Sequence, residues 1–177
     1  MKIQGLRRHQ AGFSLMELVV VVAIIAVLAA LTLGAFNFVN QNKARSTAKI
    51  QIDLLSKTIQ EYHADNRAYP VNTDANGERG DEVLYKALYW EGLEAKDSGG
   101  KIYLGELDPE NNAKGGQAWM QGKDAQARIV DPWGNFYLYR TGEQAINPDF
   151  DLWSKGPDGK TNPDPKHKDS LDDIKNF

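Results

Sequence analysis

The chain has 177 residues and no cysteine, which excludes a disulfide framework, thiolate metal sites and cysteine nucleophiles. Its mean hydropathy of −0.53 predicts one water-facing domain in addition to the apolar segment near the N-terminus. The first twelve residues hold three basic and no acidic side chains, so the rest holds 18 basic and 24 acidic ones, an excess that argues against a nucleic-acid partner.

A long apolar segment follows this basic leader. Between residues 13 and 36, Glu17 is the only charged residue, and 18–36 would form a helix about 28 Å long, close to the thickness of a bilayer core. We therefore predict that 13–36 forms a transmembrane segment. A cleaved secretory signal has an apolar core of only about 7 to 15 residues. A plain signal anchor fits the length but leaves Glu17 unexplained.

The charges that flank this segment do not decide its orientation. Three basic residues precede it and three follow it closely, so the positive-inside rule gives no preference. A short leader is easier to retain in the cytosol than a folded domain. We therefore predict a cytoplasmic N-terminus and a head on the far side of the membrane.

The leader ends in Gly12, Phe13 follows, and Glu17 lies four residues further along. With the apolar run, this pattern over residues 5–36 resembles the class III signal of the type IV pilin and type II secretion pseudopilin superfamily. The resemblance implies that residues 1–12 are a leader peptide, that a prepilin peptidase cuts between Gly12 and Phe13, and that Phe13 becomes the N-methylated mature terminus. It also implies a single-pass protein of the bacterial inner membrane with a periplasmic head.

Glu17 is costly in hydrocarbon unless a partner offsets its charge. Cleavage after Gly12 would create an amine on Phe13, and we expect the amine of one subunit to pair with Glu17 of a neighbour. Phe13 and Glu17 would then both determine assembly. The alternative is an acid near the membrane interface that is protonated or reaches the polar layer. Many members of the superfamily carry a proline where this chain has Gly34, so we predict a continuous helix here.

The apolar segment continues into an amphipathic helix. No proline or glycine interrupts residues 35–65, and apolar residues recur at steps of four and three. This stripe consists of Ala48, Ile52, Leu55, Ile59 and Tyr62. The pattern predicts one helix from about residue 14 to 65, of which the part 37–66 packs on the head.

The head, residues 67–177, begins with a second helix. Apolar residues at helical spacing predict this helix over 81–93, with acidic residues in its first turn, where the helix dipole favours them. Residues 94–128 contain many glycines mixed with Lys, Asp and Asn, which is typical of a variable loop. Within this loop we expect one strand at 101–104.

Three strands are predicted after the loop. They begin at Ile129, Phe136 and Phe150, and the turn sequence DPWGN separates the first two. A sheet over 129–154 would pack on the long helix. The predicted fold is therefore α+β, with a long N-terminal helix, a small antiparallel sheet and a C-terminal loop at 155–177.

The C-terminal half extends the resemblance. DPWGN, DLWSKGPDG and the terminal DDIKNF are similar to the major pseudopilins of type II secretion, whereas type IV pilins usually close this region with a disulfide. The resemblance implies a structural subunit of a pseudopilus, which polymerises through its N-terminal helix and drives protein export. Its implied partners are further copies of the chain, minor pseudopilins, the prepilin peptidase, the inner-membrane assembly platform and membrane lipid.

The C-terminal loop is rich in aspartate. Seven aspartates and no glutamate follow Glu143, and calcium takes about six to eight oxygen ligands from carboxylates and carbonyls. Turn capping and the balancing of lysine charges explain the same composition, and the EF-hand pattern is absent. The resemblance implies a calcium (Ca²⁺) loop with ligands from the backbone of Lys155 and from Asp158 and Asp173, and with Asp172 as a looser candidate.

Other functions fit parts of the sequence. An enzyme is not predicted, because the chain has no G-x-S-x-G motif, no phosphate-binding loop and no histidine pair at metal spacing. A membrane-anchored hydrolase that uses two carboxylates, or a surface binding module built on the four tryptophans, is the alternative from another class. A type IV pilin or a competence-type filament subunit is the nearest alternative.

Overall fold

The computed structural model describes all residues except 1–13, 73, 113–117 and 163, and of residues 31–37 it describes the backbone only. The chain divides into two compact units, one ending at Asn40 and one running from Gln41 to Phe177. The helices are α1 Leu15–Asn66, α2 Gly80–Tyr85, η1 Lys86–Trp90, α3 Glu91–Glu94, η2 Lys96–Ser98, η3 Gly105–Leu107, α4 Pro109–Asn112, η4 Asp124–Gln126, η5 Gly142–Gln144 and η6 Lys168–Ser170. The strands are β1 Met120–Gln121, β2 Arg128–Ile129, β3 Leu138–Thr141, β4 Phe150–Ser154 and β5 Ile174–Lys175.

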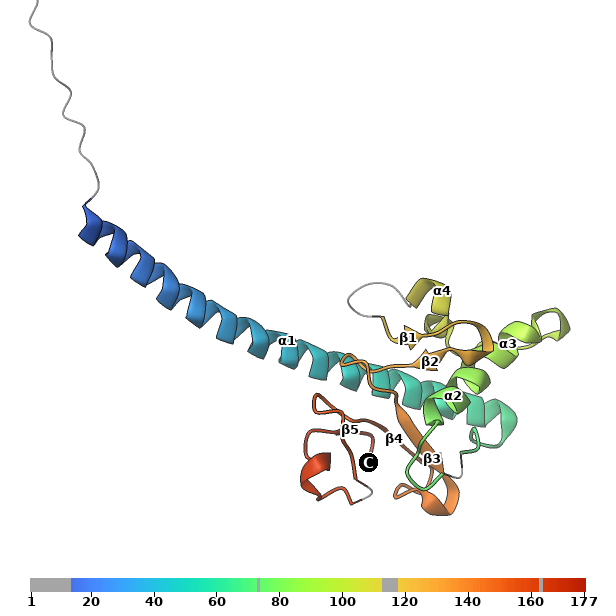
Figure 1. Cartoon of the computed structure of the whole chain (residues 1–177). Coiled ribbons are helices and arrows are strands. Elements are labelled where there is room, and N and C mark those ends of the chain that lie inside the picture. The colour runs from blue at the N-terminus through green and yellow to red at the C-terminus, as the bar shows by residue number, and fades with distance from the viewer. Residues whose placement is uncertain (1–13, 73, 113–117, 163) are drawn as a thin grey trace, which may run out of the picture. The chain divides into compact units, whose positions relative to one another are not determined.

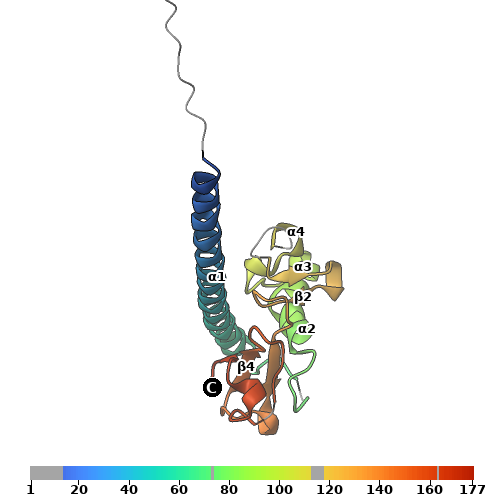
Figure 2. The ribbon, with the colours of Figure 1, turned by 60° about the vertical axis from the view of Figure 1, so that its left-hand side comes forward.

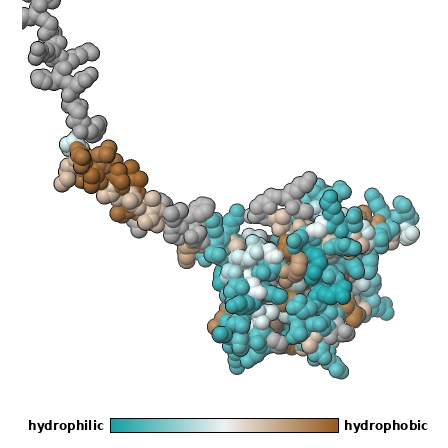
Figure 3. All heavy atoms as spheres, viewed as in Figure 1, coloured by the Kyte–Doolittle hydropathy of each residue, from teal (hydrophilic) through white to brown (hydrophobic). Residues whose placement is uncertain are grey.

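Helix α1 confirms the predicted long helix, and Gly34 lies within it without ending it. The part of α1 before Asn40 forms the first unit. Its large apolar side chains between Leu15 and Leu28 are 48% to 81% exposed. Figure 3 shows these residues in brown along the helix. Nothing within the described part of this unit covers them.

From Gln41 onward, α1 buries the predicted stripe against the head. Ala48, Leu55 and Ile59 are fully buried, Ile52 is nearly so, and Tyr62 packs at the edge of the same core. Burial of one leucine-sized side chain contributes roughly 1.5–3 kcal/mol. The period of the sequence therefore places one face of this helix in the core of the head.

Polar contacts add to this packing. The hydroxyl of Tyr137 donates to Gln51 Oε1 on α1 at 2.8 Å. Lys101 Nζ lies 2.8 Å from Glu61 Oε1 and 2.7 Å from Asp65 Oδ2, near the end of α1. These contacts join two turns of α1 to segments that come much later in the sequence.

The predicted helix at 81–93 is present as the successive segments α2, η1 and α3, of which η1 is a π-helix. Leu84, Tyr85 and Leu88 are fully buried. At Gly80 a Cβ would come within 2.4 Å of the backbone nitrogen of Tyr139 on β3. The missing side chain lets α2 lie directly against this strand.

The strands form two small antiparallel sheets. In the larger sheet, with the order β3-β4-β5, Thr141 pairs with Phe150, and Ser154 at the other end of β4 pairs with Ile174. β1 pairs with β2 in a sheet of its own, and an isolated bridge between Val130 and Phe136 links the β2 segment to the chain before β3. The view in Figure 1 and the turned view in Figure 2 show both sheets in the head.

Two details of the predicted strands are wrong. No strand forms at 101–104, because the amides of Tyr103 and Leu104 both donate to the carbonyl of Leu88 and find no strand partner. The predicted sheet over 129–154 is also incomplete. The first predicted strand, β2, pairs with β1 in a separate sheet. The sheet that contains β3 and β4 is completed by β5 from the C-terminal segment.

Strand β4 lies where the sequence predicts it, but both of its faces are buried. Arg140 and Phe177 cover Trp153 on the second face. The α+β fold, with its long helix and small antiparallel sheets, is confirmed.

Candidate functional site

The first candidate site is the N-terminal end of α1. The backbone N–H of Glu17 donates to Ser14 Oγ at 3.2 Å, and the N–H of Ser14 donates to Glu17 Oε2 at 2.9 Å. This reciprocal pair is a capping box, which satisfies amides that a helix leaves free at its start. The Glu17 carboxylate is thereby held at the backbone of Ser14, the residue that follows Phe13 in the sequence. The predicted cleavage residues Gly12 and Phe13 lie outside the described residues.

The predicted membrane anchor overlaps this site. Within the part of the chain that the structure describes, no helix combines the length and the apolar character needed to cross a bilayer. Phe13 and the side chains of residues 31–36, which belong to the predicted segment 13–36, lie outside that part. The single-pass anchor stays a prediction.

The second candidate site is the loop between β4 and β5, which carries the predicted calcium ligands. Asp131, in the sequence DPWGN, is almost fully buried and closes one end of this loop. Its Oδ2 accepts from Ser154 Oγ at 2.5 Å, and its Oδ1 accepts from the amides of Trp133 and Asn135. The side-chain amide of Asn135 donates to the carbonyl of Gly156 at 2.9 Å. One turn therefore fixes the point at which the loop leaves β4.

Asp158 and Asp172 come together where the two ends of the loop pass each other. Asp172 Oδ2 accepts from the amide of Asp158 at 3.3 Å. At Gly156, which has a φ of 64°, a Cβ would come within 2.5 Å of the carbonyl oxygen of Asp172. Only glycine suits both this approach and this left-handed backbone. Carboxylate and carbonyl oxygens thus meet at one place.

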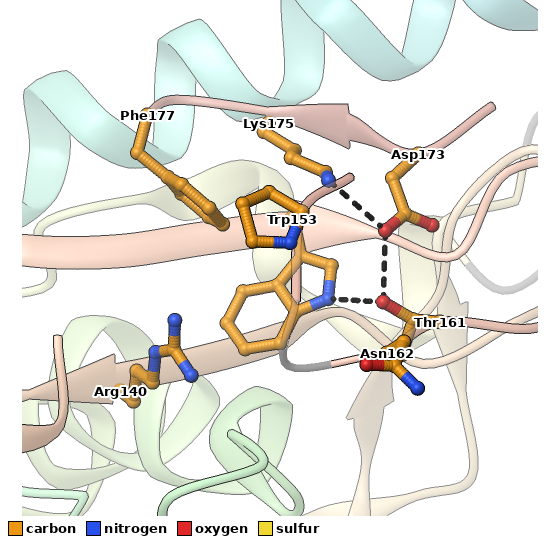
Figure 4. A pocket seen from close by; sticks show the side chains of 8 residues that line it. Arg140, Trp153, Thr161, Asn162, Asp173, Lys175 and Phe177 are labelled. Atoms are coloured by element: carbon orange, nitrogen blue, oxygen red, sulfur yellow. Dashed lines mark hydrogen bonds and ion pairs between the residues drawn. The ribbon is translucent and has the colours of Figure 1, made fainter. Parts of the chain in front are cut away.

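Asp173 lies on the edge of a small pocket of about 10 Å³ beside β4 (Figure 4). Its Oδ2 accepts from the hydroxyl of Thr161 at 2.8 Å and lies 3.5 Å from Lys175 Nζ. The indole N–H of Trp153 donates to the same hydroxyl at 3.2 Å. Asp173 Oδ1 is buried and has no hydrogen-bond partner among the described residues. Burial raises the pKa of Asp173, although Thr161 and Lys175 partly oppose this shift.

The last residues of the chain close the same pocket. The guanidinium of Arg140 donates to Asp151 Oδ2 at 2.7 Å and lies 5.2 Å from the ring of Trp153. The ring of Phe177 meets Trp153 edge-on, with 5.8 Å between the centroids. Asn176 accepts a backbone hydrogen bond from β4 through its side-chain oxygen at 2.8 Å. The C-terminal segment is therefore part of the head.

The arrangement supplies some of the oxygens that calcium requires. The carboxylate of Asp172 lies at the backbone of Asp158, and Oδ1 of Asp173, which has no partner among the described residues, is an oxygen of the kind that this ion binds. However, no three His, Cys, Asp or Glu side chains in the described ranges are grouped to hold a metal ion. Lys155 contributes only its carbonyl to the predicted set, and its Nζ lies 3.7 Å from Glu78. The calcium loop stays a prediction.

Two site residues escaped the sequence-based reasoning. The role of Ser14 had a signal, because Ser-x-x-Glu before an apolar run is the pattern of a capping box. Asp131 had a weaker one, since an aspartate at the start of a turn often accepts from the amide two residues on. Its contact with Ser154, 23 positions away, has no local signal.

Known proteins resemble the chain along most of its length. Residues 7–33 match the family described as prokaryotic N-terminal methylation motif, and residues 103–175 match the family described as type II secretion system protein G. No solved structure gives a significant match.

Two curated relatives have the name type II secretion system core protein G. The one from Pseudomonas aeruginosa is 32% identical over 154 residues, which cover 87% of this chain and 88% of the relative. The one from Escherichia coli is 30% identical over 152 residues, which cover 85% and 84%. The chain therefore belongs to the family of type II secretion system core protein G.

Proposed function

We propose that the chain is a pseudopilin that is processed by prepilin peptidase and polymerises through the first part of α1 into the pseudopilus of type II secretion. The observation that carries this proposal is the contrast between an exposed apolar helix and a folded polar head, in a chain of this family. Apolar side chains that the chain itself leaves uncovered need either lipid or other copies around them. The role is structural and requires no catalytic residue.

Processing would remove residues 1–12 and methylate the amine of Phe13. Mass spectrometry of the chain from cells with and without prepilin peptidase tests both steps together. We expect the loss of twelve residues and the gain of one methyl group only when the peptidase is present. A Gly12→Leu variant should keep its leader, whereas Gly5→Leu, within the leader, should be processed normally. Processing of Gly12→Leu at the normal site would contradict the proposal.

Glu17 would act after cleavage, when a new amine exists to offset its charge. In the uncleaved chain its carboxylate accepts from the Ser14 amide, so the charge is already positioned at the start of the helix. Two variants separate capping from charge pairing. Glu17→Gln keeps an oxygen that can accept from Ser14 but loses the charge, whereas Ser14→Ala keeps the charge and loses half of the capping box. We expect secretion and filament assembly to fail only in Glu17→Gln.

The membrane topology follows from the same proposal. The N-terminus would lie in the cytoplasm and the head in the periplasm, with minor pseudopilins and the assembly platform as partners. Protease added to spheroplasts should digest or release the head and leave an N-terminal fragment in the membrane. A head that is degraded only after the inner membrane is permeabilised would overturn this orientation.

Calcium binding at the loop between β4 and β5 is a further part of the proposal. The ion would supply positive charge next to Asp158, Asp172 and Oδ1 of Asp173, which has no hydrogen-bond partner among the described residues. Thermal unfolding of the full chain in detergent should occur at a higher temperature in millimolar calcium than in chelator. The double variant Asp158→Asn with Asp172→Asn should lose this difference, and Asp164→Asn, an exposed position in the same loop, should keep it. If calcium changed the unfolding temperature equally in the parent chain, the double variant and Asp164→Asn, the site would be excluded.

A further inference from the structure

The head contains a second, larger pocket that the C-terminal loop does not use. Its volume is about 670 Å³, within the size range of ligand sites. One wall comes from α2, η1 and α3, and the other from α4 and the turn before η4. The lining includes Tyr85, Tyr89, Trp90, Asp108, Glu110 and Asp124. We call it the aromatic–acidic pocket.

The aromatic wall has an unused polar group. Tyr85 stacks on Tyr89 with 5.7 Å between ring centroids, and Trp90 lies 6.3 Å from Tyr85. The π-helix η1 brings these residues to one side, and such segments are frequent at functional sites. Tyr85 is fully buried, yet its hydroxyl has no partner among the described residues. An unsatisfied buried group of this kind costs about 1–3 kcal/mol.

The other wall is acidic. Asp108, Glu110 and Asp124 line it, and Lys123 is the one basic residue among the described lining residues. Asp124 has a φ of 52°, a left-handed conformation that non-glycine residues seldom adopt and that occurs often at binding sites. Burial, with the acidic neighbours, raises the pKa of Tyr85 to about 12, so the phenol stays neutral at physiological pH. Ring faces beside carboxylates suit an ammonium or guanidinium group.

The same head offers cations at another place. Lys160, Lys166 and Lys168 are exposed, and within the described residues none of them forms an ion pair. We call residues 160–168 the lysine stretch. In both Figure 1 and Figure 2 this stretch, next to β5, lies apart from α3 and α4. One copy therefore does not bring its own lysines to its own aromatic–acidic pocket.

We infer that a lysine ammonium of the lysine stretch of one copy enters the aromatic–acidic pocket of the next copy. The two complementary patches lie on different parts of one head, so the contact is head-to-tail. Contacts of this type leave a free patch at each end and extend into an open helical filament, unlike the self-complementary contact of a closed dimer. The inference rests on the proposed polymerisation and adds a specific contact between heads.

Disulfide crosslinking tests this contact cleanly, because the chain has no cysteine. One tagged copy carries Lys123→Cys, which keeps all three acids of the pocket, and a second copy with another tag carries Pro165→Cys, which keeps all lysines. Both are produced together in cells that assemble the filament, and membranes are oxidised. We expect a dimer that contains both tags. Gln144→Cys, an exposed position outside the pocket, replaces Lys123→Cys as the control and should give about tenfold less of this dimer.

Charge variants then test the chemistry. Glu110→Gln with Asp124→Asn, in the copy that carries Lys123→Cys, should lower the dimer about tenfold, which corresponds to about 1.4 kcal/mol. Glu106→Gln, a nearby exposed acid that does not line the pocket, should leave it unchanged. An equal yield with and without the pocket acids would overturn the inference.

Secretion and filament formation are measured in the same cells, so that the two proposals fail in different ways. If filaments form and the two-tag dimer does not exceed the Gln144→Cys control, the contact between heads is wrong while the proposed function stands. If the cysteine-free parent chain neither forms filaments nor restores secretion, the proposed function is wrong, and this inference with it.

Discussion

The two halves of α1 have similar apolar residues but different surroundings. Between Leu15 and Leu28 these side chains are at least 48% exposed, whereas Ile52, Leu55 and Ile59 are at most 2% exposed. The second half is covered by the head of the same chain, whereas the large apolar side chains of the first half are exposed. The difference teaches that one helix can stabilise a domain with one part and leave the other part for lipid or for other copies.

The contrast divides stability from assembly. Substitutions in the second half should change the free energy of unfolding of the head, because they alter its core. Substitutions in the first half should change association and leave the head intact. Five substitutions test how sharp this division is.

The largest effect should come from Asp151→Ala, outside α1, which tests whether the buried stripe alone stabilises the head. Asp151 is fully buried, and its carboxylate accepts from Arg140 and from the amides of Ile146 and Asn147. Removal of one partner of a buried ion pair destabilises by about 3–5 kcal/mol. Urea unfolding of the full chain in detergent measures it, with the exposed Glu143→Ala as the control. If Asp151→Ala lowered the free energy of unfolding by less than Leu55→Ala does, the buried stripe of α1 would be the larger contribution to the stability of the head.

Leu55→Ala should destabilise the head by about 2–5 kcal/mol, because it leaves a cavity in the core. Ile50 lies on the same helix but is 66% exposed, so Ile50→Ala is the matched control and should change stability by less than about 0.5 kcal/mol. Similar losses in both variants would show that the second half of α1 is not held by one buried face. The same urea unfolding experiment measures both.

Asp173→Asn should have a smaller effect that depends on pH. Burial raises the pKa of Asp173 above its ordinary value of 3.8, so its ionised form is disfavoured in the folded head. Below pH 3.8 the residue is protonated in both states and the penalty is absent. The penalty grows as the pH rises through the raised folded-state pKa. The wild-type head should therefore lose stability relative to Asp173→Asn over this range in chelator, as measured by unfolding at several pH values.

The control for this pH series is Asp169→Asn, in the same loop. Asp169 is only partly buried, so the comparison isolates the effect of burying the Asp173 carboxylate. If the difference between Asp173→Asn and wild type stays constant across the series, the Asp173 carboxylate does not carry the burial penalty.

Ser14→Ala should destabilise the start of α1 by about 1 kcal/mol, because it removes one half of the capping box. Unfolding of the head should not change, since Ser14 belongs to the first unit. Hydrogen exchange of the first turn of α1 measures the local effect. The comparison is Ser46→Ala, an exposed serine inside the same helix, which should leave exchange of the first turn as it is in wild type. Equal exchange in Ser14→Ala and Ser46→Ala would show that the cap is not formed in solution.

The smallest effect on stability should come from Ile25→Ala in the first half. Ile25 is 59% exposed, so the unfolding free energy of the head should change by less than about 0.5 kcal/mol. Filament yield, by contrast, should fall if this face contacts lipid or other copies. A change in head stability of the size seen for Leu55→Ala would end the proposed division of α1.

The parts of the fold that follow a periodic pattern could be predicted from sequence. The stripe that contains Ile52 and Leu55 predicted the buried face of α1, and the segment FDLWS predicted β4. The strand expected at 101–104 failed because a short apolar run does not reveal whether a partner strand exists. Here the amides of Tyr103 and Leu104 donate to the carbonyl of Leu88 within η1.

The candidate sites were predictable only where chemistry is local. The family resemblance indicated Glu17, Asp158 and Asp173, but composition gave no sign of which acids would be inside. Asp131 and Asp151 are buried in a chain with many surface acids, and only tertiary contacts with Ser154 and Arg140 distinguish them. Likewise, no pattern in the sequence predicts that the hydroxyl of Tyr85 is buried without a partner among the described residues.

The position of Phe177 has a practical consequence for anyone who works with this protein. Its ring packs on Trp153, and the neighbouring Asn176 is bonded to β4, so the last two residues hold the edge of a sheet. An affinity tag or fluorescent fusion attached at Phe177 would lie beside these contacts and should weaken them. Labels belong instead at an exposed turn such as the one around Gly142, where the chain can accept added residues without opening the sheet.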